Sequence, residues 1–437
     1  MNAREGASVK DYTAACDAMT KLRDRRTFFR EIARCKAENI RGHVILVQPS
    51  QLLQVNRMYG VPTGDALIQS IAQYLDTLDP AYTAYRVASS RFMLLGPACG
   101  RAQAEAFAEG MSRRFSESWA ITAGEQTSRI QVKTYLAHLF LSPEDAEENA
   151  LMDKLDYAVS LLSGKGSAGL LFFDDALKQA MDDQTYVLEE LRYAIENKTF
   201  QMYYQPIYSC REKRFTSAES LIRLFDQRGG FISPGKFIPM AEANGLIDQI
   251  SRIVLEKVCA FLGAHPELPL RTVSVNLTGE QVLAPDFIQQ IRTLLDTYRL
   301  DGSRLRIEIT ERTVTEDFPA VKRVMERLEA WGIRFYLDDF GTGYSNLASM
   351  LSLPFEVIKF DQSLIRVMDG TPQGQRTIGL LAEIMHENRY EIVAEGIETE
   401  VQAHMAYEKE LDRIQGFFYA KPLPEDALLA FLKENAD

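Results

Sequence analysis

Short β-rich runs alternate with amphipathic helical patterns through the second half of the chain, and this rhythm constrains the fold more than any other feature. The eight β-rich runs lie at 201–208, 217–224, 272–277, 305–310, 334–339, 356–361, 391–396 and 414–420. Helical patterns separate most of them, as at 250–262 and 320–331. Eight strands with intervening helices over about 240 residues are the count and length of a TIM-type (β/α)8 barrel.

The first half also mixes helices and strands, but with a different spacing. Its β-rich runs lie at 43–48, 91–96, 130–140 and 169–174, and an apolar-periodic stretch at 63–76 joins the first two. This pattern predicts an α/β sandwich. Residues 175–198 contain neither Pro nor Gly and predict a stiff helical connector. We therefore expect four segments: a leader (1–16), an α/β domain (17–174), the connector (175–198) and the barrel (199–437).

Composition narrows the classes of partner. The 437 residues carry a formal net charge of -12, which argues against duplex nucleic acid because phosphate binding needs a basic surface. No apolar run reaches the ~18 residues that span a bilayer, and the N-terminus lacks the apolar core of a signal peptide. The five cysteines are scattered without a CxxC pair, which favours free thiols in a reducing compartment. We expect a cytoplasmic protein with no membrane and no nucleic-acid partner.

Polar and charged residues gather at or near the ends of the predicted barrel strands. They are Glu219, Asn276, Glu308, Glu311, Asp338, Asp339, Lys359, Asp361, Glu395 and Gln415. In a parallel barrel the C-terminal strand ends converge on one face, where converging carboxylates repel one another unless cations neutralise them. Oxygen ligands suit Mg²⁺ or Mn²⁺ better than Zn²⁺, and none of the five histidines lies at these positions. The pattern predicts a site for hard divalent cations.

Each acid also has an ordinary structural interpretation. A single carboxylate at a strand end is most often a helix N-cap or a surface ion-pair partner. The adjacent pair Asp338-Asp339 is harder to explain in this way, because it leads into a loop in which Gly341 and Gly343 permit a tight turn. A glycine pair alone is weak, but five or more such coincidences in one barrel favour a functional site.

The segment from about 184 to 435 resembles the EAL domain, a cyclic di-GMP-specific phosphodiesterase with a modified TIM barrel. The resemblance runs in order through ESLIRL (family EALLR), SPGKFIPMAEANGLI, SVNLTGEQV, IEITE, DDFGTGYSNL, IKFDQSLI, VAEGIET and QGFFYAKPL. Three departures are mild. Ser220 replaces the middle Ala of EAL, Arg312 follows the ELTE-like motif where Ser is usual, and Glu410 stands where Gly is common.

The resemblance implies a binuclear metal site with two Mg²⁺ or Mn²⁺ ions. The ligands that it implies for the first metal are Glu219, Asn276, Glu308 and Asp338. Asp338 would bridge to the second metal, with Asp339 and Glu395 nearby. Two such ions lower the pKa of a bridging water and stabilise the leaving alkoxide of a phosphodiester. The implied reaction opens cyclic di-GMP to linear pGpG.

The resemblance also implies roles for residues outside the metal shell. Lys359 would orient or activate the attacking water, and Glu311 would hold the DDFGTG loop. Contacts to the substrate are implied for the remaining residues Gln205, Arg223, Gln415 and Asp361. EAL domains commonly work as homodimers, so we expect a dimer through the barrel.

The first half, over roughly 17–173, resembles a GGDEF domain, the fold of diguanylate cyclases. DAMTKLRDRRTFF and NRMYGVPTGDALI carry the resemblance. The catalytic letters differ, since ASSRF (88–92) stands in place of GGDEF and the metal-binding aspartate position falls on Gln48, with Ser50 at its neighbour. Arg91 puts a cation where the family has a metal-ligating acid. This pattern predicts an inactive domain with a regulatory or dimerising role.

The sequence therefore favours an enzyme that hydrolyses cyclic di-GMP. The alternative is a catalytically silent cyclic di-GMP receptor that signals through a protein partner. Receptors of this kind usually lose metal ligands, and every ligand position is filled here. A bifunctional cyclase and phosphodiesterase is disfavoured by ASSRF and Gln48.

Overall fold

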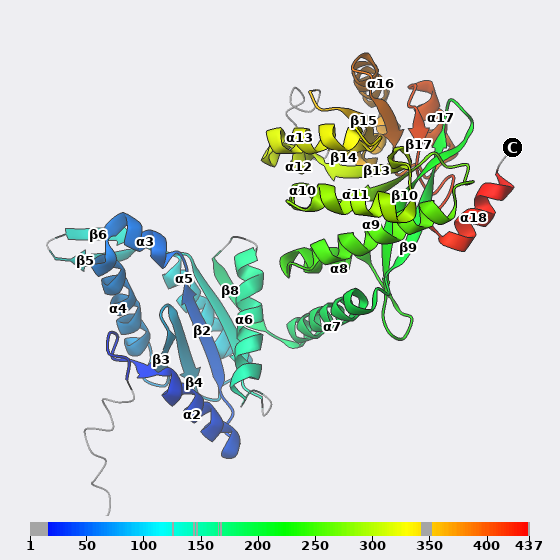
Figure 1. Ribbon diagram of the computed structural model, residues 1–437. Helices are drawn as coiled ribbons and strands as arrows, with labels where there is room; N and C mark the ends of the chain where they lie inside the picture. Colours follow the sequence, from blue (N-terminus) through cyan, green and yellow to red (C-terminus); the bar gives the residue numbers. More distant parts are fainter. Residues whose placement is uncertain are drawn as a thin grey trace, which may run out of the picture. The chain divides into compact units, whose positions relative to one another are not determined.

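The computed structural model describes residues 16–435, except 125, 143–144, 146, 165, 167 and 342–351, and except the side chains of 126, 314–316 and 369. The chain divides into two compact units, residues 1–185 and 186–437 (Figure 1). The division falls inside helix α7 (Asp175–Asn197), which coincides with the predicted connector. Within the described part of the chain, no helix is both long enough and apolar enough to cross a membrane.

Unit 1 is built on a six-stranded sheet in the order β1-β3-β4-β2-β7-β8. These strands are β1 (Arg23–Asp24), β2 (His43–Pro49), β3 (Thr83–Ala88), β4 (Arg91–Gly96), β7 (Thr134–Phe140) and β8 (Gly169–Phe173). A separate antiparallel pair comprises β5 (Trp119–Ala123) and β6 (Gln126–Ile130). The predicted strand 130–140 corresponds to β7 and reaches only the last residue of β6, and β1, β3 and β5 were not predicted.

Helices cover both faces of the unit 1 sheet, as expected of an α/β sandwich. Its helices are α2 (Arg25–Ala37), α3 (Leu52–Tyr59), α4 (Val61–Thr77), α5 (Arg101–Phe115) and α6 (Glu148–Gly164). One core lies between the sheet and α2 and α6, with Phe28 and Leu155 fully buried. The other lies between the sheet and α4 and α5, where Leu67 and Ala108 are fully buried.

Unit 2 is a closed eight-stranded barrel. Its strands are β9 (Gln201–Ser209), β10 (Arg214–Phe225), β12 (Thr272–Asn276), β13 (Leu305–Thr310), β14 (Arg334–Phe340), β15 (Phe355–Phe360), β16 (Glu391–Ala394) and β17 (Arg413–Ile414). From β10 through β17 all neighbours are parallel. Short strands β11 (Phe231–Ile232) and β18 (Leu423–Pro424) pair at the margins with β10 and β9.

Two features depart from a regular (β/α)8 barrel. The first strand, β9, is antiparallel to both of its barrel neighbours and joins β10 through a hairpin, not a helix. The predicted last strand, 414–420, is only Arg413–Ile414, since the chain turns at once and the N–H groups of Tyr419 and Ala420 both bond to Gly416 O. The aromatic run FFY suggested a strand, but Tyr419 instead stacks on Tyr208 of β9.

The outer core of unit 2 lies between the strands and the surrounding helices. Those helices are α8 (Pro234–Ala243), α9 (Ile247–Ala264), α10 (Gly279–Val282), α11 (Phe287–Tyr298), α12 (Glu311–Glu316), α13 (Phe318–Glu329), α15 (Gln362–Gly370), α16 (Pro372–Glu387), α17 (Glu400–Glu408) and α18 (Glu425–Glu434). In α13 the buried residues Val321, Met325 and Leu328 recur at helical spacing and form one apolar stripe. Helix α7 contributes Val187 and Leu191 to this core.

Strand alternation explains why the barrel interior is polar at its ends. On β12, Val273 and Val275 are fully buried in the outer core, so Ser274 and Asn276 face the opposite way, into the barrel. Midway along the interior a small apolar layer closes the barrel, formed by Ile207, Tyr336, Val357 and Val393. The two ends of the barrel are therefore separate polar regions.

Candidate active site

Seven of the predicted site residues lie on or directly after successive barrel strands. They are Glu219 on β10, Asn276 on β12, Glu308 on β13, Asp338 on β14, Lys359 on β15, Glu395 after β16 and Gln415 after β17. The structure brings them together at one end of the barrel, as the converging strand ends predict. We call Glu219, Glu308, Asp338 and Glu395 the carboxylate cluster.

The carboxylate cluster surrounds the ammonium group of Lys359. Its Nζ lies 2.6 Å from Glu308, 2.7 Å from Glu395, 3.0 Å from Asp338 and 3.4 Å from Glu219. The Lys359 side chain is 1% exposed and that of Glu308 is 0% exposed. A buried charge is tolerated only when it is paired, so this lysine is the internal counter-ion of the cluster.

Amide side chains fix the orientation of Glu219. Asn276 Nδ2 donates to its Oε1 and Gln415 Nε2 donates to its Oε2, both at 2.6 Å. Gln415 also donates to Gln205 Oε1 at 3.1 Å, and Gln205 donates to Ala420 O at 3.1 Å. Gln205 reaches the site because the antiparallel β9 pairs it directly with Glu219. These bonds hold a buried carboxylate in one rotamer before any ligand binds.

A β-bulge places the two adjacent aspartates. Between β14 and β15 the register shifts from Leu337–Ile358 to Phe340–Phe360, so Asp338 and Asp339 together oppose Lys359. Asp339 takes a positive φ of 56°. A bulge of this kind redirects side chains, and it lets two consecutive aspartates lie near one site. Burial and the charge of Asp338 raise the pKa of Asp339.

Electrostatics in the carboxylate cluster are strongly perturbed. Burial raises the pKa of Glu308 well above its usual range, although Lys359 opposes the shift. Burial likewise raises the pKa of Glu395, to about 8. Burial alone would lower the pKa of Lys359, but the four surrounding carboxylates together raise it well above its ordinary value. More negative charge is buried here than one ammonium neutralises, so the cluster favours a further cation.

The donor set suits a hard divalent cation. Glu308 Oε1 is buried, and no hydrogen-bond donor among the described residues reaches it. Asn276 uses its Nδ2 on Glu219, which leaves its amide oxygen for another partner. Across the described part of the chain, however, no group of three or more His, Cys, Asp or Glu side chains is already arranged as a metal cage. Lys359 occupies the centre of the cluster, where a metal would compete with it for the same oxygens.

Two cavities open beside the cluster. One of about 330 Å³ is bordered by Arg223, Asn276, Glu308, Asp338 and Asp339, among others. The other, of about 280 Å³, is bordered by Gln205, Asp361, Glu395, Gln415 and Phe417, among others. The four residues implied as substrate contacts therefore divide between two cavities on either side of the carboxylates.

The outer residues have defined local partners. The Arg223 guanidinium lies 5.4 Å from the centre of the Tyr203 ring and donates to Ile222 O at 3.0 Å. Asp361 caps α15 by accepting from Ser363 N at 2.8 Å. Sequence reasoning did not single out Phe417, which is 56% exposed beside the smaller cavity. The aromatic run after Gln415 was the available signal, and it was interpreted as a strand.

Glu311 is buried at the first position of α12, directly after β13. The loop that it was predicted to hold begins at Gly341, which has a positive φ of 103°. Residues 342–351, including Gly343, lie outside the described residues. Its loop-anchoring role therefore stays a prediction.

The EAL domain family matches residues 188–422. The chain belongs to this family. A second family, described as diguanylate cyclase, GGDEF domain, matches residues 14–166, so the two domains stand in tandem. EAL domains depend on divalent metal, in keeping with the oxygen donors assembled around Lys359.

The relatives of this EAL protein are longer tandem proteins. It is 29% identical over 425 residues to the bifunctional diguanylate cyclase/cyclic di-GMP phosphodiesterase MucR of Pseudomonas aeruginosa, covering 95% of this chain and 61% of MucR. It is 27% identical over 432 residues to the cyclic di-GMP phosphodiesterase NbdA of the same species, covering 96% of this chain and 54% of NbdA. The chain thus spans little more than half the length of these relatives.

Solved structures confirm the barrel. A structure titled PaMucR phosphodiesterase, c-di-GMP complex, shares 31% identity with a TM-score of 0.53, covering 56% of this chain and 99% of that one. The FimX EAL domain of Pseudomonas aeruginosa shares 22% identity with a TM-score of 0.51, covering 54% and 96%, and supports the fold alone. The fold class predicted from the sequence, a GGDEF-like α/β domain followed by a modified TIM barrel, is confirmed.

In the GGDEF domain, ASSRF lies at the hairpin between β3 and β4. Arg91 forms an ion pair with Asp156 of α6, at 2.9 Å. Gln48 is on β2, and no described donor reaches its buried Oε1. Ser50 donates to Lys133 O at 2.9 Å. Arg91 and Ser50 thus make local contacts within unit 1.

Proposed function

We propose that the EAL domain of this protein hydrolyses cyclic di-GMP to linear pGpG with the help of divalent metal. The observation that carries the proposal is the convergence of the carboxylate cluster, Asn276 and Lys359 at one end of the barrel. Relatives over nearly the whole chain are named cyclic di-GMP phosphodiesterases. The proposal therefore rests on the substrate named for these relatives and on a site in which each motif position carries the residue type that the chemistry needs.

The residues proposed as metal ligands are those that sequence reasoning singled out. Glu219, Asn276, Glu308 and Asp338 would hold one ion, and Asp338 and Asp339 would serve a second with Glu395 nearby, each ion being Mg²⁺ or Mn²⁺. When bound, such ions supply Lewis-acid stabilisation to a phosphodiester and make a water molecule more acidic. Gln415 and Asn276 keep Glu219 oriented, so this carboxylate need not reorganise on binding.

Lys359 is proposed as the residue that positions the attacking water. Its ammonium carries three donors, and the high pKa imposed by the carboxylates keeps it charged. With cations held by the carboxylate oxygens, the ammonium of Lys359 would have donors available to hold a water beside the phosphate. Gln205, Gln415, Arg223 and Asp361 are proposed to contact the substrate from the two flanking cavities.

Unit 1 is proposed to be a regulatory or dimerising scaffold without cyclase activity. ASSRF and Gln48 remove the acids that a cyclase needs, while the apolar cores on both faces of the sheet are complete. A domain that keeps its apolar core but not its catalytic acids would be retained for its contacts with other domains or subunits. We further propose a homodimer through the EAL domain and a cytoplasmic location.

A second candidate function is a cyclic di-GMP receptor without turnover. One observation favours it: Lys359 already neutralises part of the carboxylate cluster, and no preformed metal cage exists among the described residues. A site closed in this way could bind the dinucleotide and leave it intact. The filled ligand positions make the enzyme the better-supported function.

Incubation of the purified chain with cyclic di-GMP decides between the two. Mg²⁺ and Mn²⁺ are added in parallel, with a chelator as the control, and products are separated by chromatography. Metal-dependent appearance of pGpG supports the enzyme. Binding of cyclic di-GMP with no product under either metal supports the receptor and refutes hydrolysis.

A further inference from the structure

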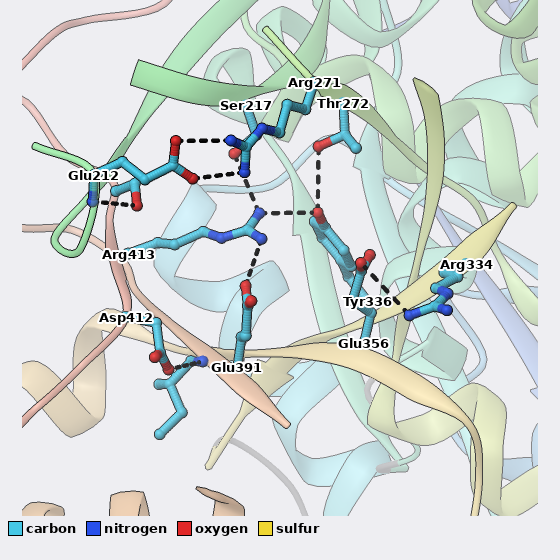
Figure 2. Close-up of polar contacts among 12 residues, drawn as sticks. Glu212, Ser217, Arg271, Thr272, Arg334, Tyr336, Glu356, Glu391, Asp412 and Arg413 are labelled. Carbon is cyan, nitrogen blue, oxygen red and sulfur yellow. Dashed lines mark hydrogen bonds and ion pairs between the residues drawn. The ribbon is translucent and has the colours of Figure 1, made fainter. Parts of the chain in front are cut away.

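The barrel has a second polar mouth, at the end opposite the carboxylate cluster. A cavity of about 970 Å³ opens there among the N-terminal ends of β12, β13 and β15–β17 and the β9–β10 hairpin. It is lined by five arginines, Arg211, Arg271, Arg304, Arg306 and Arg413, and by four carboxylates, Glu212, Glu356, Glu391 and Asp412. We call it the arginine cavity. Figure 2 shows the polar contacts around part of it.

Two carboxylates in this region are each shared between two arginines. Glu212 accepts two bonds from Arg271, at 2.6 and 2.8 Å, and also pairs with Arg214 at 2.9 Å. Glu356 pairs with both Arg306 and Arg334. Each of these carboxylates thus serves two guanidinium groups. The lining itself carries five guanidinium groups against four carboxylates, and in a chain with a net charge of -12 this balance favours anions at the cavity.

The floor of the arginine cavity is held rigidly. Arg413 pairs with Glu391 and donates to Tyr336 Oη at 3.2 Å and to Ser217 Oγ at 3.4 Å (Figure 2). Its side chain is only 16% exposed, and although burial alone would lower its pKa, the phenol of Tyr336 and the carboxylate of Glu391 raise it above its ordinary value. Tyr336 belongs to the apolar layer that closes the barrel, so this cavity is separate from the carboxylate cluster.

One guanidinium group has unused donor capacity. Arg304 Nη1 donates to the carbonyls of Leu262 and His265, at 3.2 and 3.1 Å. Its Nη2 is buried, and no acceptor among the described residues reaches it. A buried unpartnered donor on a charged group is costly, and a bound anion would remove that cost. Arg211 adds an exposed guanidinium at the rim.

We propose that the arginine cavity binds a phosphate-bearing small molecule of nucleotide size. Guanidinium forks match phosphate oxygens in pairs and repel cations, which favours an anion of this class over a metal. The volume is at the upper end of the range for ligand pockets, so it accepts a base and sugar along with the phosphate. The site does not use the carboxylate cluster and does not depend on the hydrolytic function proposed above.

Isothermal titration of the full chain tests the proposal, in buffer with a chelator so that metal-dependent binding is suppressed. Pyrophosphate probes the phosphate chemistry alone, and 5′-GMP probes phosphate with a nucleoside. The test variants are Arg304→Gln and Arg211→Glu, and the control is Arg252→Gln, which removes an exposed arginine that forms a surface ion pair with Asp286. Arg211 is exposed, so its variant tests the site even if Arg304→Gln weakens the fold.

We expect binding of at least one probe by the unmodified chain, weakened by about tenfold or more in both test variants and unchanged in the control. Tighter binding of 5′-GMP than of pyrophosphate would identify a nucleotide as the occupant, and the reverse an inorganic phosphate. No binding of either probe would overturn the proposal and leave a structural ion-pair network. Binding that survives both test variants would equally overturn it, because the phosphate would then be held elsewhere.

Discussion

The two units of this protein are both α/β structures with complete apolar cores, yet their polar strand ends differ in kind. In the barrel, four carboxylates converge on Lys359, which is 1% exposed. In unit 1, the corresponding functional edge carries Gln48 and the Ser89-Ser90 turn, followed by Arg91 in a partly exposed ion pair. The contrast shows that a complete apolar core does not require a cluster of acids at the strand ends.

The cost of keeping each arrangement also differs. A carboxylate cluster with one counter-ion is held at the expense of stability, because buried acids repel one another and lose their hydration. The raised pKa values of Glu308 and Glu395 express that expense. The side chains of Arg91 and Asp156 are 31% and 41% exposed. Because water solvates both charges, this ion pair changes the stability of the fold little. The buried carboxylate cluster lies in the unit that we propose carries the chemistry.

The largest effect is expected from the charge of Glu219. Glu219→Ala should lower hydrolysis of cyclic di-GMP by at least about 100-fold, because it removes an anionic ligand from the proposed metal site. Glu219→Gln keeps the shape and is the matched variant. We expect it to be almost as inactive, with kcat measured under saturating Mg²⁺.

Disturbed packing around Glu219 is the competing explanation for a loss of hydrolysis in Glu219→Ala. Glu219 accepts hydrogen bonds from Asn276 and Gln415, so the alanine variant leaves two buried amides without an acceptor. Activity of Glu219→Gln within a few-fold of the unmodified chain would show that shape matters and the charge does not. That outcome would end the assignment of Glu219 as a metal ligand.

A second prediction concerns Lys359, the counter-ion of the carboxylate cluster. Lys359→Ala should lower kcat by orders of magnitude while KM changes modestly, because the lysine is proposed to act on water and not on the dinucleotide. Steady-state kinetics with Mg²⁺ measure the split, and Lys433→Ala on the exposed end of α18 is the control. A loss confined to KM would move Lys359 from catalysis to substrate binding.

Much of the fold could be predicted from the sequence, because apolar periodicity reports burial directly. The barrel strands from β10 to β16 and the helix α7 lie close to their predicted ranges. The misses have local causes. β3 is a six-residue strand beside a hairpin with no glycine or proline to mark it, and the run after Ile414 is apolar because Tyr419 stacks on Tyr208, not because it is a strand.

The candidate site was predicted less completely than the fold. Strand-end positions identify which acids converge. The distances within the carboxylate cluster, however, depend on the β-bulge at Asp338-Asp339, where two residues of β14 oppose one residue of β15. The sequence gives no signal for such a bulge. The direction of β9 was also hidden. Only its antiparallel pairing brings Gln205 opposite Glu219, and a strand–helix rhythm suggests the reverse orientation.

The third prediction tests unit 1 directly. The full chain should make no cyclic di-GMP from GTP and Mg²⁺, because ASSRF and Gln48 provide no acids for the metal. Removal of residues 1–174 should leave a folded barrel with hydrolysis or association state altered by about a few-fold, since a contact domain acts through positioning. Product chromatography and light scattering measure both.

A second truncation sharpens that test. Removal of residues 1–185 takes away the first part of α7 and keeps Val187 and Leu191, which pack in the barrel core. If α7 transmits a shift, the two truncations should differ from each other as well as from the full chain. Cyclic di-GMP synthesis by the full chain, or a barrel that matches it in rate and association state, would contradict the regulatory interpretation.

The smallest effect is expected from Ser220, where the chain departs from the EAL letters. Its Oγ donates to Ser274 O at 2.6 Å in a buried setting, so Ser220→Ala removes one hydrogen bond and no charge. We expect a loss of about 1 kcal/mol in unfolding free energy, seen as a fall of about 2–4 °C in Tm, with hydrolysis within about twofold. Ser217→Ala, on the same strand but at the arginine cavity, is the matched control for a buried hydroxyl. If Ser220→Ala instead changed kcat more than tenfold while Ser217→Ala did not, the serine would have a part in the chemistry that its hydrogen bond to the neighbouring strand does not explain.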